Sequence, residues 1–260
     1  MTKELVSHYA GVLNSARINA QPIVQLSQSY KISRSDAYEM QEMQMSARLA
    51  TGEKQVGWKM GLTSEAKRKQ MNLNSPLYGF LTDKMQVHNK GEFNIASQIH
   101  SKIEPEIAFL ISKDLPNNPS RSQVMESVSA VAPALEILDS RYTEFKYFSM
   151  EDVIADNSSS SFFVLGSWKK KFNQIDLKNL KLTMKVDGVA KQTGTTEAIS
   201  GDPAQSVIEL CHLLAERGQT LKAGSVVLAG AATAAEALQS GQVITLEIEQ
   251  LEKIEVKIVG

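Results

Sequence analysis

Apolar residues recur at helical spacing in three segments of the chain. In the first, Leu5, Tyr9 and Leu13 fall on one face of a helix that begins near the N-terminus. A second helix is expected over 33–51, because that segment opens with serine and aspartate as cap candidates and closes before a glycine. The third covers 202–218, where an aspartate cap and a first-turn proline precede the apolar stripe. The pattern therefore predicts two helices near the N-terminus and one near the C-terminus.

From about residue 55 the pattern changes to short apolar runs separated by turn residues, which is typical of β-strands. These runs cover 55–62, 102–111, 132–139, 161–168, 180–188, 225–230 and 243–260. Asp187 and Gly188 are expected to form a hairpin turn. The chain is therefore predicted to be an α+β protein, with a smaller helical region over 1–75 and a β-rich domain over 76–260 that carries one or two helices. The strand near 55–62 would join that domain.

Composition and charge narrow the class of protein but say nothing about its chemistry. The 260 residues carry 28 Lys and Arg against 29 Asp and Glu, a formal net charge of -1. This balance gives no electrostatic reason to expect a nucleic acid or a membrane as partner. No apolar run approaches the roughly 20 residues that span a bilayer, no secretory signal is evident at the N-terminus, and Cys211 is the single cysteine. We therefore expect a cytoplasmic protein.

Three glutamates occupy otherwise apolar runs that are expected to be strands. Glu104 and Glu106 are two residues apart, so their carboxylates point to the same face. Glu136 lies in a second apolar run. Buried carboxylates are costly unless they are paired or bound to a metal, and three of them on neighbouring strands would suit a hard divalent cation, Mg²⁺ or Mn²⁺. The alternative is a solvated strand face.

Two further features are candidates for binding or catalysis. Lys59 lies in an apolar strand, where burial would lower its pKa and make it usable for proton transfer, unless the amine reaches solvent. The polar segment 155–161 is either a plain loop or a set of donors that hold a carboxylate. The four histidines show no metal-ligand spacing, and no nucleophile elbow, P-loop or dinucleotide fingerprint is present.

The chain from about residue 30 to its end resembles the hydratase and decarboxylase branch of the fumarylacetoacetate hydrolase superfamily. The blocks that carry the resemblance, in order, are VGWKMGLTSEAKRKQM, SPLYGFLTDKM, KIEPEIAF, ALEILDSRYTEF, VIADNSSSSFFVLG and AGSVVLAGAATAA. The resemblance implies a mixed β-rich catalytic core of that superfamily's type. It also implies a Mg²⁺ or Mn²⁺ site at Glu104, Glu106 and Glu136, a catalytic lysine at Lys59, and a serine, Ser159, that helps to hold the substrate carboxylate.

One position separates the two activities of this branch. Its hydratases usually carry PDYG, whose aspartate works with the lysine, whereas this chain has PLYG with Leu77 at that place, as in the decarboxylases. Adding water across a double bond is helped by a second titratable group. Loss of CO₂ instead needs an electron sink and a poorly solvated carboxylate, which a leucine beside the substrate would favour. The resemblance therefore implies decarboxylation.

The expected reaction is the decarboxylation of 2-oxo-3-hexenedioate to 2-hydroxy-2,4-pentadienoate and CO₂, in aromatic meta-cleavage catabolism. Electrons would flow from the breaking bond to the 2-oxo oxygen, where Lys59 would assist. A homo-oligomer, or an association with the pathway hydratase, is expected from the resemblance.

Three other interpretations remain open. A hydratase would need Asp83, Asp139 or Asp156 to act in place of the missing aspartate. Hydrolysis of an acylpyruvate would call for a His–Glu pair, which is not evident near the motif blocks. A non-catalytic subunit that stabilises the hydratase would have no need of a buried cation site.

Overall fold

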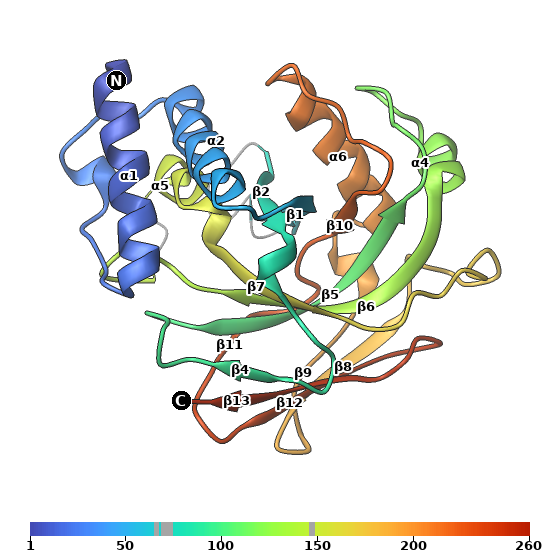
Figure 1. Cartoon of the computed structure of the whole chain (residues 1–260). Helices are drawn as coiled ribbons and strands as arrows, with labels where there is room; N and C mark the ends of the chain where they lie inside the picture. Colours follow the sequence, from blue (N-terminus) through green and yellow to red (C-terminus); the bar gives the residue numbers. More distant parts are fainter. Residues whose placement is uncertain (65–67, 69–74, 146–148) are drawn as a thin grey trace.

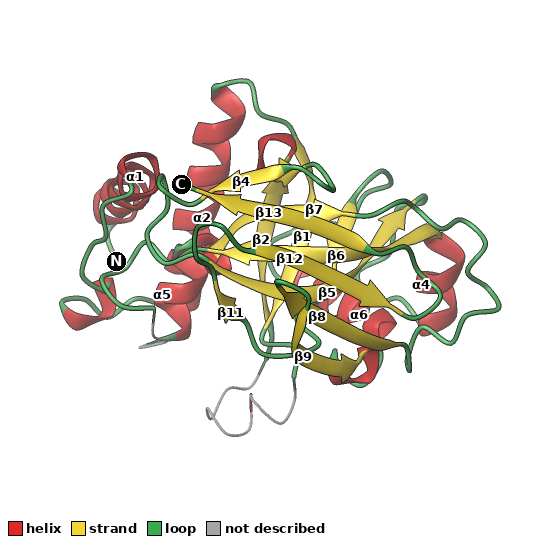
Figure 2. Ribbon diagram, turned by 90° about the horizontal axis from the view of Figure 1, so that it is seen from below, coloured by secondary structure: helices red, strands yellow, loops and turns green. Residues whose placement is uncertain are grey.

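Two mixed β-sheets form the body of the protein in the computed structural model, which describes residues 1–64, 68, 75–145 and 149–260. In this part of the chain the larger sheet has eight strands and the smaller has five. Figure 1 shows the helices above the larger sheet and the smaller sheet below it. Figure 2 views the same arrangement from the side of the smaller sheet. The predicted α+β class is confirmed.

The strand order brings segments far apart in the sequence side by side. The larger sheet runs β2 (Leu77–Thr82), β1 (Gln55–Gly61), β10 (Val226–Leu228), β5 (Lys102–Ile111), β6 (Val128–Leu138), β7 (Ser160–Leu165) and β3 (Gln86–Val87), and β11 (Glu236–Ala237) also pairs with β5. The smaller sheet runs β4 (Glu92–Asn94), β13 (Ile254–Val259), β12 (Val243–Ile248), β8 (Lys181–Val186) and β9 (Val189–Thr195). Three strand pairs within the described residues are parallel: β1 with β10, β3 with β7 and β4 with β13.

Local sequence accounts for the turns and most element ends. Asp187 and Gly188 have φ angles of 50° and 79° and join β8 to β9, which confirms the predicted hairpin. The long apolar run over 243–260 divides into two strands at a turn in which Gln250 has a φ of 63°. Gly57 is required where β1 approaches β10, since a Cβ there would lie 1.8 Å from the Val226 carbonyl oxygen.

Five α-helices of the described chain lie against the larger sheet. They are α1 (Lys3–Asn19), α2 (Arg34–Ala50), α4 (Arg121–Ser127), α5 (Met150–Ala155) and α6 (Pro203–Ala215), with short 3₁₀ segments at Leu26–Gln28, Asp83–Met85, Asn157–Ser159 and Thr196–Ala198. The three predicted helices are confirmed, and Ser33 and Asp202 cap two of them as expected. The β-rich part carries three α-helices in the described chain rather than one or two, because α4 and α5 span only 7 and 6 residues and show no readable periodicity.

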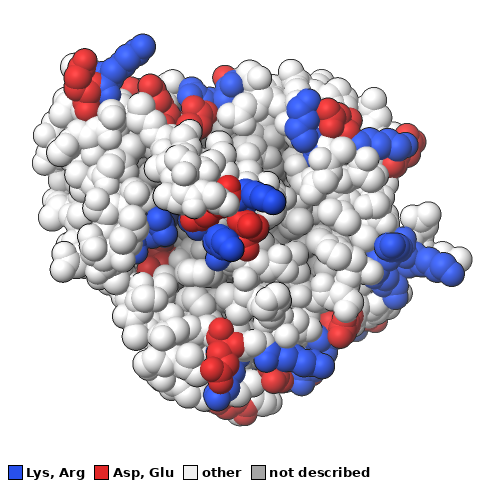
Figure 3. Space-filling model, viewed as in Figure 1, with Lys and Arg blue, Asp and Glu red and all other residues white. Residues whose placement is uncertain are grey.

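The charge distribution on the surface agrees with the near-neutral composition. Figure 3 shows acidic and basic side chains interspersed over the face in view, without a large area of one sign. No helix in the described ranges is both long enough and apolar enough to cross a membrane. Strand β1 lies between β2 and β10 and buries Trp58 and Met60 in the main core. The division of the chain near residue 75 stays a prediction.

Candidate metal centre

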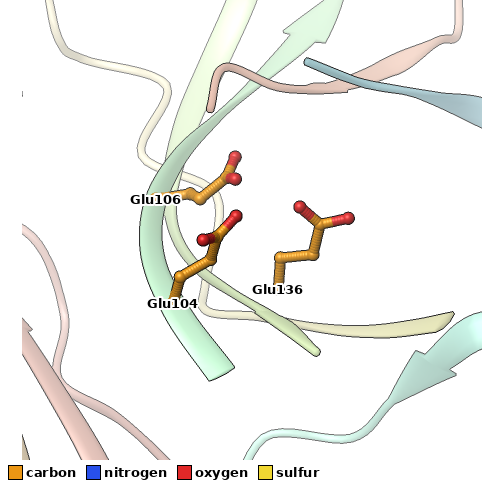
Figure 4. A group of neighbouring side chains, drawn as sticks. All are labelled: Glu104, Glu106 and Glu136. Atoms are coloured by element: carbon orange, nitrogen blue, oxygen red, sulfur yellow. The ribbon is translucent and has the colours of Figure 1, made fainter. Parts of the chain in front are cut away.

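Three glutamate side chains converge from the paired strands β5 and β6. Glu104 lies directly opposite Glu136 in the antiparallel register, and Glu106 follows Glu104 on the same face of β5. Each side chain offers a carboxylate oxygen within 4.8 Å of those of the other two. Figure 4 shows the three carboxylates pointing toward one another. Glu106 and Glu136 are fully buried, so they do not form the solvated strand face that was the alternative.

Two buried glutamates of this cluster each keep a carboxylate oxygen without a hydrogen-bond partner among the described residues. Glu106 Oε2 accepts a hydrogen bond of 2.7 Å from the Gly230 N–H, but Glu106 Oε1 and Glu136 Oε1 have no hydrogen-bond partner among the described residues. Burial raises the pKa of Glu106 well above its ordinary value, and the neighbouring Glu136 and Glu104 raise it further. An all-carboxylate set of this kind fits a hard divalent cation with oxygen ligands.

Lys59 extends from β1 into the same cluster. Its side chain is buried, with Nζ 3.0 Å from Glu136 Oε2 and 3.1 Å from the Ser158 carbonyl oxygen. Desolvation works to lower the pKa of Lys59, but the three glutamates more than offset it, so the pKa is raised. The expected net lowering of this pKa is therefore wrong: burial does act to lower it, but the sequence alone did not show that the lysine faces three carboxylates.

A cavity of about 260 Å³ opens beside the cluster. Its charged lining residues in the described chain are Lys59, Glu104 and Lys102. The larger apolar side chains around it are Leu62, Leu77, Leu138, Phe145 and Val153. Leu77 stands on β2 opposite Gly61 of β1 and is only 1% exposed. The cavity therefore joins a charged end to an apolar wall that includes Leu77, and the contact of Leu77 with a substrate stays a prediction.

A tight turn after α5 forms another wall of the cavity. Asn157, Ser158 and Ser159 have φ angles of 48°, 54° and 58°, a left-handed conformation that costs of order 1–3 kcal/mol for each residue. The Asn157 side chain accepts from the Phe80 N–H at 2.8 Å and donates to the Phe80 carbonyl at 3.1 Å. Ser158 Oγ donates to the Tyr78 carbonyl at 2.6 Å. These bonds to β2 hold the turn in its strained shape.

The turn places Ser158 rather than Ser159 on the cavity wall. Ser158 lines the cavity, and its carbonyl oxygen accepts the hydrogen bond from Lys59. Ser159 is the next residue in the same buried turn, with 3% exposure. Its contact with a substrate carboxylate stays a prediction.

The three aspartates that could replace the missing acid group are engaged elsewhere. Asp83 accepts a hydrogen bond from the Lys54 N–H at 2.8 Å. Asp139 accepts from the backbone N–H groups of Ile99 and His100. Asp156 is ion-paired with the Arg141 guanidinium, and burial raises its pKa to about 6 although Arg141 opposes the shift. None of the three lines the cavity in the described chain.

Sequence reasoning missed a second support of the site, which comes from α2. Gln41 Nε2 donates to the Tyr78 and Ile154 carbonyl oxygens, both at 3.0 Å, and Gln44 Nε2 donates to the Ala155 carbonyl at 2.6 Å. Both glutamines are buried. Two glutamines in an amphipathic helix give no signal of such a role, because glutamine side chains are mostly exposed in folded proteins.

Loss of the Arg141 side chain is expected to destabilise the fold strongly. Arg141→Ala leaves the Asp156 carboxylate buried without its cation, which costs about 3–5 kcal/mol of unfolding free energy. Arg121→Ala removes an exposed partner of Asp202 and should cost no more than about 1 kcal/mol. Urea unfolding of both variants measures the difference. Equal losses in the two variants would contradict a special role for the buried pair.

Comparison with known proteins identifies relatives over most of the chain. The family model described as "Fumarylacetoacetate (FAA) hydrolase C-terminal" matches residues 52–259. A 4-oxalocrotonate decarboxylase from Pseudomonas sp is 42% identical over 246 residues, covering 95% of each chain. A 2-hydroxyhexa-2,4-dienoate hydratase from Comamonas testosteroni is 34% identical over 198 residues, 75% of each chain.

A solved structure gives the same result for the whole fold. The 4-oxalocrotonate decarboxylase from Pseudomonas putida G7, complexed with magnesium and adipate, superposes with a TM-score of 0.96 at 34% identity, covering 100% of this chain and 99% of that one. A fumarylpyruvate hydrolase from Pseudomonas aeruginosa, at 17% identity and a TM-score of 0.65, shares the fold alone. With the family model covering most of its length, this chain belongs to the fumarylacetoacetate hydrolase family.

Proposed function

We propose that this protein decarboxylates 2-oxo-3-hexenedioate to 2-hydroxy-2,4-pentadienoate and CO₂ in a metal-dependent reaction. The observation that carries the proposal is that the buried Lys59 and an apolar wall that includes Leu77 line the same cavity. Apart from the glutamate cluster, no carboxylic acid of the described chain lines the cavity beside Lys59. The full-length likeness to 4-oxalocrotonate decarboxylases supports the same activity.

The glutamate cluster is assigned to Mg²⁺ or Mn²⁺. Glu104, Glu106 and Glu136 would hold the ion, consistent with the magnesium complex of the Pseudomonas putida relative. When bound, the cation supplies Lewis-acid stabilisation of negative charge on the 2-oxo acid, worth several kcal/mol in the transition state.

The residues of this chain would assist the bond cleavage in two ways. As the bond between C5 and C6 breaks, its electron pair forms the C4–C5 double bond, the former C3–C4 pair moves to C2–C3, and the carbonyl pair moves to the 2-oxo oxygen. Lys59 Nζ would donate a proton to that oxygen, which completes the enol of the product. Leu77, Leu62 and Val153 would exclude water from the departing carboxylate. Ser159, in the turn beside Ser158, is proposed to help hold the substrate carboxylate.

Hydration of 2-hydroxy-2,4-pentadienoate is the alternative, because hydratases of 30–34% identity are also relatives. It requires a second acid–base group, and Leu77 cannot be one. A homo-oligomer, or an association with the pathway hydratase that accepts the reactive dienol product, belongs to the same proposal.

A paired assay in Mg²⁺ tests the assignment. The wild type is expected to consume the dioate with release of CO₂ and not to hydrate the dienol. Leu77→Asp should slow decarboxylation by about 10²-fold, because it places a solvated charge against the departing carboxylate. Wild-type hydration of the dienol without CO₂ release from the dioate would overturn the proposal.

A further inference from the structure

A second lysine, Lys102, lines the cavity and has no role in the mechanism described above. Lys102 begins strand β5, is half-buried, and also borders a neighbouring depression that opens to solvent. Lys59, by contrast, is only 2% exposed. The two cations of the cavity therefore differ in depth, with Lys102 on the side nearer to solvent.

Strand geometry fixes the position of Lys102 relative to the glutamate cluster. Lys102, Glu104 and Glu106 are alternate residues, so they share one face of β5. Successive residues on one face of a strand are about 6.6 Å apart. This spacing is comparable to the extended length of a six-carbon chain. A ligand with its 2-oxo acid end at the glutamates can therefore reach Lys102 with its other end.

The Lys102 ammonium is available for such a ligand. The described part of the chain contains no carboxylate in an ion pair with it, and its recorded contact is with the Phe145 ring, 4.3 Å from Nζ to the ring centroid. Phe145 lines the cavity as well, so the ring holds the ammonium at the cavity edge. Lys59 is not available in the same way, since it already contacts Glu136 and the Ser158 carbonyl.

We propose that Lys102 binds the distal carboxylate of the substrate and thereby selects dianionic over monoanionic 2-oxo acids. The inference rests on the proposed function, because it takes the substrate to be a dioate. Cleavage converts that carboxylate to neutral CO₂, so the contact with Lys102 is lost when the product forms. Lys102 would then distinguish substrate from product and favour product release. A charge-assisted contact of this type is expected to give a preference of about 10- to 100-fold.

The preference can be measured without turnover, by calorimetric titration in Mg²⁺. The probes are 2-oxoadipate, a saturated dioate, and 2-oxohexanoate, a monoacid of the same chain length. The wild type is expected to bind 2-oxoadipate about 10- to 100-fold more tightly. Lys102→Met should weaken 2-oxoadipate alone by that factor, Lys102→Arg should keep most of the preference, and Lys113→Met, at an exposed lysine, is the control.

Kinetics supply a second measurement with the natural substrate. The contact is made in the ground state and fades as CO₂ leaves, so Lys102→Met should raise KM by about 10- to 100-fold, raise kcat rather than lower it, and change kcat/KM much less than KM. Equal weakening of both probes by Lys102→Met, or an unchanged preference, would overturn the inference while decarboxylation by the wild type persists. If the wild type does not decarboxylate the dioate but prefers 2-oxoadipate through Lys102, the proposed function fails and the subsite stands.

Discussion

Glu106→Gln is expected to remove most of the metal-dependent activity and at the same time to stabilise the metal-free protein. The glutamine amide would keep the shape of the side chain and could still accept the Gly230 N–H, but it would be a weaker ligand for a hard cation. Loss of one of three carboxylates should lower kcat/KM by about 10²- to 10³-fold. Turnover measured against Mg²⁺ concentration, together with the Mg²⁺ dissociation constant, tests this result.

The expected gain in stability of the metal-free variant follows from the raised pKa of Glu106. Its folded pKa lies above the ordinary value of 4.5, so the folded protein binds more protons and its unfolding free energy falls as pH rises above that value. Glu106→Gln removes this dependence, and its Tm in chelator should exceed that of the wild type at about pH 8 and approach it at about pH 5. Adding Mg²⁺ should raise the wild-type Tm most at the higher pH. Full wild-type activity in excess chelator would contradict a metal site here.

Lys59→Met is expected to remove catalysis while leaving metal binding largely in place. Methionine matches the length of the lysine stem but supplies neither charge nor proton, so kcat should fall by about 10²- to 10⁴-fold. In chelator the variant should also lose about 3–5 kcal/mol of unfolding free energy, because Glu136 is left buried without its cation. Mg²⁺ should recover part of that loss.

The matched control for this variant is Lys84→Met, which changes an exposed lysine just after β2. It should leave kcat and stability close to the wild-type values. A Lys59→Met protein that binds Mg²⁺ normally and turns over at the wild-type rate would show that the proton comes from another group.

The sequence predicted the elements of the site better than their mutual contacts. Alternation in 102–111 predicted that Glu104 and Glu106 share a face, and the structure confirms it, because strand periodicity is a local property. The opposition of Glu104 and Glu136 depends on the register of β5 against β6, which the sequence does not encode locally. The predicted direction of the Lys59 pKa shift was wrong because the position of Lys59 beside the three carboxylates likewise depends on how the strands pair.

The support of the site by hydrogen bonds was beyond sequence reasoning. The turn at Asn157 was expected only as a polar segment, because nothing in it indicated three successive left-handed residues or a side chain that bonds to the Phe80 backbone. Lys102 carried a signal that was not used, since it continues the alternation of the two glutamates by one more step toward the N-terminus.

The buried glutamines of α2 bear on how this enzyme could be divided or recombined. The matched family region begins at residue 52, after α2, yet Gln41 and Gln44 donate to backbone carbonyls of Tyr78, Ile154 and Ala155 beside the cavity. A chain shortened to the matched region would keep every proposed catalytic residue and still lose these donors. The N-terminal helices are thus not an interchangeable module. Replacing these helices with those of a relative would also change the side chains that support the cavity wall. Such chimaeras are therefore expected to alter specificity without a change in any residue that lines the cavity.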